Sequence, residues 1–177
     1  MTKKYLKNFD NLKIGLFGGS FNPPHFGHVF VAKQAIKNMQ LDQVWLLFCK
    51  KNPLKSAKYQ NAELRMQMTK ELIGYNKKIK VIDTDDIYTY KTLRDFKKKF
   101  TRCKFTWIMG MDSLKNFHLW DKWQEIAKRT KIAVFDRGKD LHTAVRSKAA
   151  VKFLKKNQFN LLFTKKQNIS STEMRGN

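Results

Sequence analysis

Acidic residues are scarce in this sequence, which has 14 Asp and Glu against 37 Lys and Arg and a formal net charge of +23 at pH 7. Such a surface either binds nucleic acid or serves solubility and attracts small anions. The basic clusters are spread along the whole chain, and they consist mainly of lysine, whereas nucleic-acid reading favours arginine. We therefore expect a solvated basic surface and no nucleic-acid partner, with a basic nucleic-acid-binding module as the alternative.

Cysteine is nearly absent, since Cys49 and Cys103 are the only two. Neither has a partner at the spacing of a metal or redox motif, so both are interpreted as buried thiols. Long apolar runs are absent as well. The start, "MTKKYLKNFDNLK", has no stretch of signal-peptide length, and no later run approaches the roughly 18 apolar residues of a membrane span. These features predict a cytoplasmic protein without a membrane partner.

The composition predicts a folded core, because 42% of the residues are hydrophobic and 13% are aromatic. The 177 residues suit one domain that buries about 70% of the surface of its unfolded chain. No internal repeat, low-complexity segment or linker divides the chain. We expect residues 1–177 to form a single domain.

Apolar runs typical of strands alternate with helical patterns along the chain. The strand-like runs lie at 13–17, 43–48, 80–82, 105–109, 131–135 and 160–163. The helical stripes are Val29 to Met39, Leu64 to Leu72, Leu93 to Phe100, Trp123 to Ala127 and Leu141 to Leu154. Continuous apolar strands are expected where helices cover both faces of a parallel sheet. The pattern predicts an α/β fold with a Rossmann-like, doubly wound parallel sheet of five to six strands.

The segment "GLFGGSFNPPHFGH", residues 15–28, joins the first expected strand to the first expected helix. It matches neither a dinucleotide-binding G-x-G-x-x-G motif nor a P-loop. Gly18 and Gly19 permit close approach of a ligand, and the two prolines at 23–24 stiffen the helix entrance. A helix that begins near His25 places the imidazoles of His25 and His28 on its first turn, beside free N–H groups. Together these features predict a phosphate site.

Two later segments also follow expected strands. Ile169, Ser170, Ser171 and Thr172 precede Glu173, an arrangement that suits a helix N-cap whose hydroxyls and N–H groups face phosphate oxygens. Arg175 adds a planar cation. Asp112, which follows Gly110, either accepts hydrogen bonds from ribose hydroxyls or caps its own helix.

The first motif, "GGSFNPPHFGH", resembles the nucleotidyltransferase family of α/β adenylyltransferases, whose H-x-G-H element His25–His28 matches. Four further segments are similar to the nicotinate-nucleotide adenylyltransferases of that family, although Ser20 and Asn22 stand where the family commonly has Thr and Asp. These segments are "NPLKSA" with Pro53 and Lys55, "YTYKTLR" with Thr89, Thr92 and Leu93, "WIMGMDSLKNFHLWDKW" with Gly110, Asp112, Leu114, Trp120 and Trp123, and "ISSTEMR".

The resemblance implies that the phosphate of nicotinate mononucleotide attacks the α-phosphorus of ATP, giving deamido-NAD and pyrophosphate in NAD biosynthesis. His25 and His28 would be catalytic, and Mg²⁺ would arrive with ATP rather than in a protein metal site. The implied ATP-binding residues are Gly18, Gly19, Ser20, Phe21, Gly110, Asp112, Ile169, Ser170, Ser171, Thr172 and Arg175. The implied substrate-binding residues are Lys55, Thr89 and Trp120, with Trp120 stacking on the pyridine ring and Trp123 in the core.

Another adenylyltransferase of the same fold, such as the phosphopantetheine enzyme, is the alternative because it shares the first motif. Thr89, the Trp120 region and the ISST segment favour the nicotinate enzyme. The oligomeric state is left open.

Overall fold

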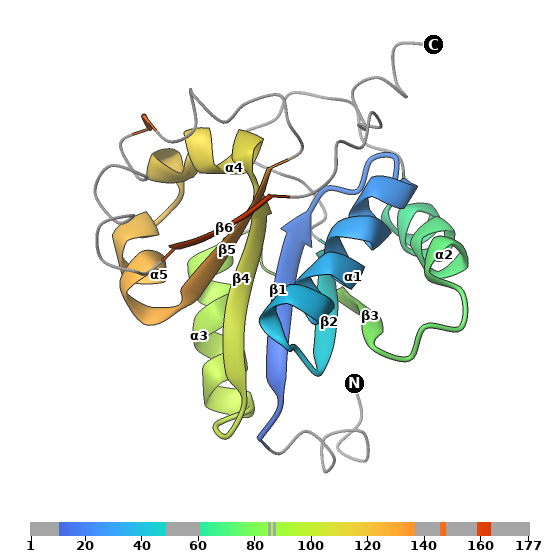
Figure 1. Cartoon of the computed structure of the whole chain (residues 1–177), viewed down its shortest axis with the longest axis horizontal. Helices are drawn as coiled ribbons and strands as arrows, with labels where there is room; N and C mark the ends of the chain where they lie inside the picture. The colour runs from blue at the N-terminus through green and yellow to red at the C-terminus, as the bar shows by residue number, and fades with distance from the viewer. Residues whose placement is uncertain are drawn as a thin grey trace.

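The computed structural model describes residues 11–48, 61–84, 86, 88–136, 146–147 and 159–163, the last five by their backbone. They form a six-stranded parallel sheet with helices on both faces (Figure 1). The predicted fold class is therefore confirmed. Each strand includes the apolar run that predicted it. The strands are β1 (Lys13–Gly19), β2 (Gln43–Phe48), β3 (Ile79–Asp83), β4 (Lys104–Gly110), β5 (Lys131–Asp136) and β6 (Phe159–Phe163).

The strand order is β3-β2-β1-β4-β5-β6. The chain starts at β1, builds outward to β3, and then returns to the other side of β1 to add β4, β5 and β6. The order therefore reverses between β1 and β4, which lie side by side in Figure 1. In open α/β sheets, ligands bind beyond the carboxyl ends of the strands at such a switch point.

The helices alternate with the strands much as expected. They are α1 (Phe26–Met39), α2 (Ala62–Ile73), α3 (Thr89–Lys99), α4 (Met111–Lys115), the 3₁₀ turn η2 (Phe117–Leu119) and α5 (Trp123–Arg129). The sequence patterns did not predict α4 and η2, because each is too short for a periodic stripe. The helix expected at 141–154 lies almost entirely outside the described residues.

The two faces of the sheet pack against different helices. Ile14 and Leu16 of β1 belong to one buried cluster, together with residues of α3, α4 and α5. Phe17 belongs to a second cluster, together with residues of α1 and residues that pack on it from α2. Because successive side chains of a strand point to opposite faces, a sheet covered on both sides needs apolar residues at consecutive positions. This explains the continuous apolar runs.

Helix α2 differs from its prediction. The stripe Leu64, Met68 and Leu72 was expected to face the core, but Leu64 is 51% exposed. The buried positions of α2 are Arg65 and Thr69 instead. The helix is therefore turned by about one residue, or 100°, from the expected orientation. Apolar periodicity failed here because a charged side chain takes the innermost position.

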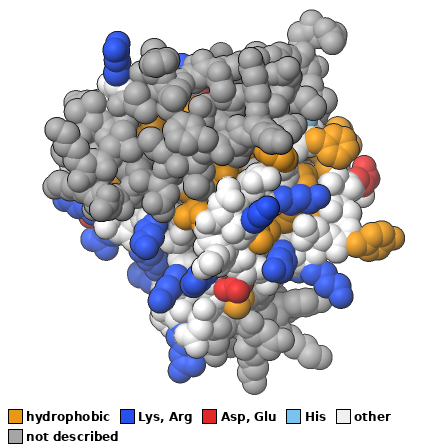
Figure 2. Space-filling model, viewed as in Figure 1, with side chains coloured by type: hydrophobic (Ala, Val, Ile, Leu, Met, Phe, Trp, Pro, Cys, Tyr) orange, Lys and Arg blue, Asp and Glu red, His pale blue; other side chains and the backbone are white. Residues whose placement is uncertain are grey.

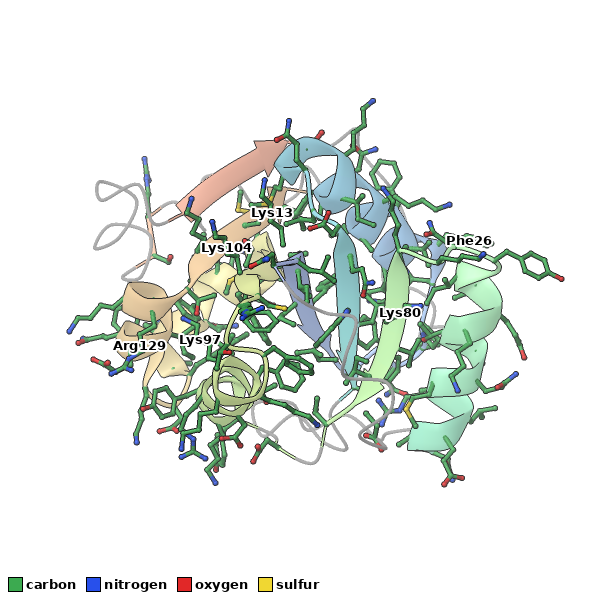
Figure 3. The ribbon with its side chains drawn as sticks, turned by 90° about the horizontal axis from the view of Figure 1, so that it is seen from below. Lys13, Phe26, Lys80, Lys97, Lys104 and Arg129 are labelled. Atoms are coloured by element: carbon green, nitrogen blue, oxygen red, sulfur yellow. The ribbon has the colours of Figure 1, made fainter. Side chains whose placement is uncertain are left out.

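One lysine side chain connects helix α3 to helix α5. Lys97 of α3 and Arg129 of α5 lie close together (Figure 3), and the Lys97 Nζ donates a hydrogen bond to the backbone carbonyl of Arg129, the last residue of α5. A cation is favourable at the carbonyl end of a helix. Burial and the nearby Arg129 guanidinium lower the pKa of Lys97. Lys97 is the first of three consecutive lysines, and it therefore links α3 to α5 as well as adding to the surface charge.

Among the described residues on the face shown in Figure 2, Lys and Arg side chains lie at several separate positions rather than in one stripe. This distribution favours the solvated-surface interpretation, and the absence of a nucleic-acid partner stays a prediction. Within the described ranges, no helix is long and apolar enough to cross a bilayer. Cys103 is half-buried rather than buried, because it lies in the turn between α3 and β4; Cys49 lies outside the described residues.

Candidate functional site

Each of the two strands at the switch point, β1 and β4, ends at a glycine. β1 ends at Gly19 and its neighbour β4 ends at Gly110. Residues 20–25 then lead from β1 into α1, so the predicted phosphate loop lies at the carboxyl edge of the sheet. The predicted ATP-binding residues Gly18, Gly19, Ser20 and Gly110 are thus brought to one edge.

His25 and His28 form a reciprocal cap at the start of α1. His25 is the N-cap residue, and its Nδ1 accepts a hydrogen bond from the backbone N–H of Gly27 at 3.1 Å. The His28 Nδ1 accepts from the backbone N–H of His25 at 3.2 Å. The ring centroids are 3.8 Å apart, with 33° between the planes. The two imidazoles are therefore neighbours, as their spacing predicted, although His25 is the N-cap residue and lies just before the first turn of α1.

This cap fixes the tautomer of both rings. A nitrogen that accepts a hydrogen bond carries no proton, so a neutral His25 or His28 must hold its proton on Nε2. Each ring can then donate one hydrogen bond to a ligand through Nε2. The sequence predicted free N–H groups beside the imidazoles, but the N–H groups of His25 and Gly27 are used by the cap. The imidazole Nε2 atoms are consequently the donors that this pair offers.

Phe21 is a buried structural residue of the loop rather than an exposed ligand contact. It is 1% exposed, and its ring stacks on Phe48 at 4.5 Å and meets the His28 ring edge-on at 4.9 Å. Its φ of 44° lies in the left-handed region, which costs a residue with a side chain about 1–3 kcal/mol. Any contact of Phe21 with ATP would therefore come from its backbone.

Arg65 of α2 contacts this loop, and sequence reasoning missed it. Its side chain is fully buried, and its Nη1 donates a hydrogen bond to the backbone carbonyl of Ser20. Burying a guanidinium is unfavourable unless hydrogen bonds compensate it. In the sequence, Arg65 lies next to Leu64 of the apolar stripe. An arginine at such a position is ordinarily solvated, so the pattern did not indicate burial.

Trp120 is held edge-on by two aromatic residues. Its ring lies 6.1 Å from that of Trp107 and 5.3 Å from that of Phe117, with interplanar angles of 88° and 76°. Trp107 belongs to β4, and Phe117 is fully buried in η2. Trp120 is half-buried and Trp123 packs partly against the same core. Sequence patterns could not identify Trp107 and Phe117 as supports, because their contacts to Trp120 are tertiary.

Thr89 is the first residue of α3, where helix N–H groups have no partner within the helix. Its N-cap residue, Tyr88, makes no side-chain cap hydrogen bond. The start of α3 is tied to the Trp120 segment, because the Lys122 Nζ lies 4.7 Å from the centre of the Tyr90 ring. Tyr90 follows Thr89 directly, and Lys122 lies two residues after Trp120. The contact between Lys122 and Tyr90 therefore joins the two segments that carry these predicted substrate-binding residues.

Asp112 lies exposed in the first turn of α4. Gly110 is the N-cap residue of that helix, and no side chain caps it. Asp112 is thus not the N-cap residue of its helix, and its hydrogen bonding to a ribose stays a prediction. Lys55, Ile169, Ser170, Ser171, Thr172 and Arg175 lie outside the described residues.

The Trp107 ring leaves no room for a side chain at position 18. A Cβ built on Gly18 would lie 2.6 Å from the Cζ2 and Cη2 atoms of that indole. We expect Gly18→Ala to destabilise the protein by about 1–3 kcal/mol in urea unfolding, because a rigid ring must move. Trp107→Phe should relieve part of this cost in the double variant. A Gly18→Ala cost that is equally large with Phe at position 107 would contradict this explanation.

Among the residues that the structure describes, no three His, Cys, Asp or Glu side chains come together as a possible metal site.

The sequence is similar to those of known proteins. The model of the family described as cytidylyltransferase-like matches residues 16–177. A Rhizobium johnstonii protein named "Probable nicotinate-nucleotide adenylyltransferase" is 47% identical over 129 residues, which are 70% of this chain and 64% of that protein. The chain thus spans a little under two thirds of that relative. A Ruegeria protein of the same name is 35% identical over 78% of this chain and 75% of its own length.

Solved structures share the fold. Plasmodium falciparum nicotinic acid mononucleotide adenylyltransferase complexed with NaAD superposes with a TM-score of 0.75 at 22% identity, covering 93% of this chain and 83% of that one. A nicotinate-nucleotide adenylyltransferase structure from Vibrio parahaemolyticus gives 0.57 at 22% identity, covering 74% and 77%. At this identity the likeness concerns the fold.

Proposed function

Because this chain belongs to the cytidylyltransferase-like family and to its nicotinate-nucleotide adenylyltransferase branch, we propose that it transfers the adenylyl group of ATP to nicotinate mononucleotide. A phosphate oxygen of the mononucleotide attacks the α-phosphorus of ATP. The bond from that phosphorus to the oxygen bridging toward the β-phosphorus breaks, and pyrophosphate leaves with the electron pair. The products are deamido-NAD and pyrophosphate.

The observation that carries this proposal is the His25–His28 pair, whose ring centroids lie 3.8 Å apart, next to the switch point of the sheet. A phosphate is already a nucleophile, so catalysis needs alignment and stabilisation of the charge that grows on the leaving pyrophosphate. Two imidazoles at the start of α1, next to the carboxyl edge of the sheet, suit that task. His28 is the stronger candidate for stabilising the adenylyl group during transfer, because it is half-buried whereas His25 is 3% exposed.

The remaining nucleotide contacts are proposals of the same kind. Gly18, Gly19 and Ser20 would let the triphosphate approach the backbone, and Gly110 with Asp112 would lie near the ribose. Ile169, Ser170, Ser171, Thr172 and Arg175 would bind phosphate oxygens, and Lys55 would bind the acceptor. Mg²⁺ would enter as part of the ATP substrate, neutralising phosphate charge.

Acceptor recognition would rest on Trp120 and Thr89. A flat indole face suits a pyridinium ring, and the N–H groups in the first turn of α3, which have no partner within the helix, suit a carboxylate. The second feature favours nicotinate over nicotinamide, whose amide carries no negative charge.

Trp120 gives a direct test of acceptor binding. We expect Trp120→Leu to raise the KM for nicotinate mononucleotide roughly 3- to 10-fold, because stacking contributes about 0.5–1.5 kcal/mol beyond burial. The KM for ATP should be unchanged. Leu119, which is 57% exposed beside it, provides the control, and Leu119→Ala should change neither value. An unchanged KM for the acceptor in Trp120→Leu would remove Trp120 from the acceptor site.

The overall function is tested by supplying the purified protein with ATP, Mg²⁺ and one acceptor at a time. Pyrophosphate release should be fastest with nicotinate mononucleotide, slower with nicotinamide mononucleotide and absent with phosphopantetheine. Release with phosphopantetheine alone would instead identify the alternative adenylyltransferase of this fold.

A further inference from the structure

Arg65 is the most deeply buried charged side chain near the phosphate loop, and the proposed chemistry does not use it. It is 0% exposed although it lies on α2, a helix whose other buried position is Thr69. The Thr69 Oγ1 donates to the Arg65 carbonyl at 2.8 Å. The guanidinium reaches 45 residues back in the sequence to donate to the carbonyl of Ser20.

This hydrogen bond sets the peptide plane between Ser20 and Phe21. The bond is trans, so the Ser20 carbonyl and the Phe21 N–H point in opposite directions. Because the carbonyl points to Arg65, the Phe21 N–H must point away from it. Phe21 itself has a φ of 44°, a conformation that persists only when its surroundings enforce it. The guanidinium is one of the groups that enforce it.

The Phe21 ring contacts His28, so a constraint on Phe21 also affects His28 and its neighbour His25. The Phe21 ring lies 4.9 Å from that of His28 with 70° between the planes, and it also stacks on the Phe48 ring at 4.5 Å. His28 in turn accepts the N–H of His25 through Nδ1 and lies 3.8 Å from its ring. A change in the conformation of Phe21 therefore changes the surface against which the His28 ring rests.

We infer that Arg65 is a positioning residue, which orients the His28 imidazole through the Ser20 carbonyl and the Phe21 ring. The expected effect on kcat rests on the proposed adenylyl transfer. The expected effect on the orientation of His28 rests only on the contacts described above. The guanidinium suits the role, because its Nη1 donor belongs to a rigid planar group, whereas a lysine ammonium is a point charge on a flexible stem.

The test compares Arg65→Lys and Arg65→Met with wild type. Both should lower kcat about 10- to 100-fold, since small misplacements of a catalytic group have effects of this size, while KM for both substrates changes little. Gln67→Ala is the matched control. Gln67 is an exposed residue of the same helix that bonds Glu71 at 2.9 Å, and its loss should leave kcat unchanged.

Histidine nitrogen NMR supplies a readout that does not depend on activity. Correlations between ¹⁵N and ring protons should show His28 as the Nε2–H tautomer in wild type and in Gln67→Ala. In the Arg65 variants the His28 signals should shift or show a mixture of tautomers. A merely structural arginine would lower the urea midpoint without altering kcat of the folded protein or these signals, and that result overturns the inference.

Phe21→Leu keeps the test decisive if neither Arg65 variant folds. It leaves the guanidinium in place but removes the ring that contacts His28, so it should reproduce the loss in kcat and the altered His28 signals. Unaltered His28 signals in Phe21→Leu would break the chain of contacts and overturn the inference. Absence of product from the wild-type protein would instead reject the proposed function, while the NMR comparison would still decide the role of Arg65.

Discussion

Replacing His28 with asparagine should lower kcat about 10²- to 10³-fold and leave stability nearly unchanged. Loss of one positioned donor to a transition state commonly has an effect of this size. The asparagine Oδ1 can take the place of the imidazole Nδ1, which accepts the His25 N–H at 3.2 Å. No atom of asparagine replaces the Nε2–H. The variant therefore keeps the cap and removes the donor.

The converse variant, His28→Gln, separates the two roles of the ring. Its amide nitrogen can take the position of Nε2, but no acceptor stands at the position of Nδ1. We expect His28→Gln to keep more turnover than His28→Asn and to lose part of the capping energy, which is about 0.5–2 kcal/mol. Steady-state kinetics and urea unfolding measure the two effects. If asparagine retained turnover near that of wild type, the Nε2–H of His28 would not take part in the transfer.

The loop that carries His28 was predictable because its information is local. Gly18, Gly19, His25 and His28 lie within eleven residues of one another, and their order at a strand-to-helix junction already predicted two imidazoles on one turn. The sheet was predictable for a related reason, since burial on both faces leaves an apolar run in each strand. The capping hydrogen bonds were not, because histidine is an uncommon cap and its tautomer depends on the backbone geometry.

The supports of the site were hidden because they depend on contacts between distant segments. Arg65 looked like a solvated residue of an amphipathic helix until α2 was seen to turn it inward. Trp107 looked like one more apolar residue of β4, although its indole fills the space above Gly18 and meets Trp120 edge-on. Periodicity identifies a buried face, but it does not show which side chain that face supports.

Phe117→Ala should destabilise the protein more than either Gly18→Ala or His28→Gln. Phe117 is fully buried, and its ring lies 5.3 Å from Trp120 and 6.0 Å from Trp123. Removing a buried phenyl ring costs about 3–5 kcal/mol, through lost burial and the cavity that remains. The free energy of unfolding, measured in urea, should fall by this amount.

Phe117→Leu provides the functional half of the same experiment, because it fills more of the space and should leave enough folded protein for kinetics. Without the edge contact to Phe117, the Trp120 ring loses one of its two aromatic supports and should stack less well on a pyridinium ring. The KM for nicotinate mononucleotide should therefore rise, while the KM for ATP stays the same. A destabilised Phe117→Leu protein with an unchanged acceptor KM would mean that Trp107 alone is enough to orient Trp120.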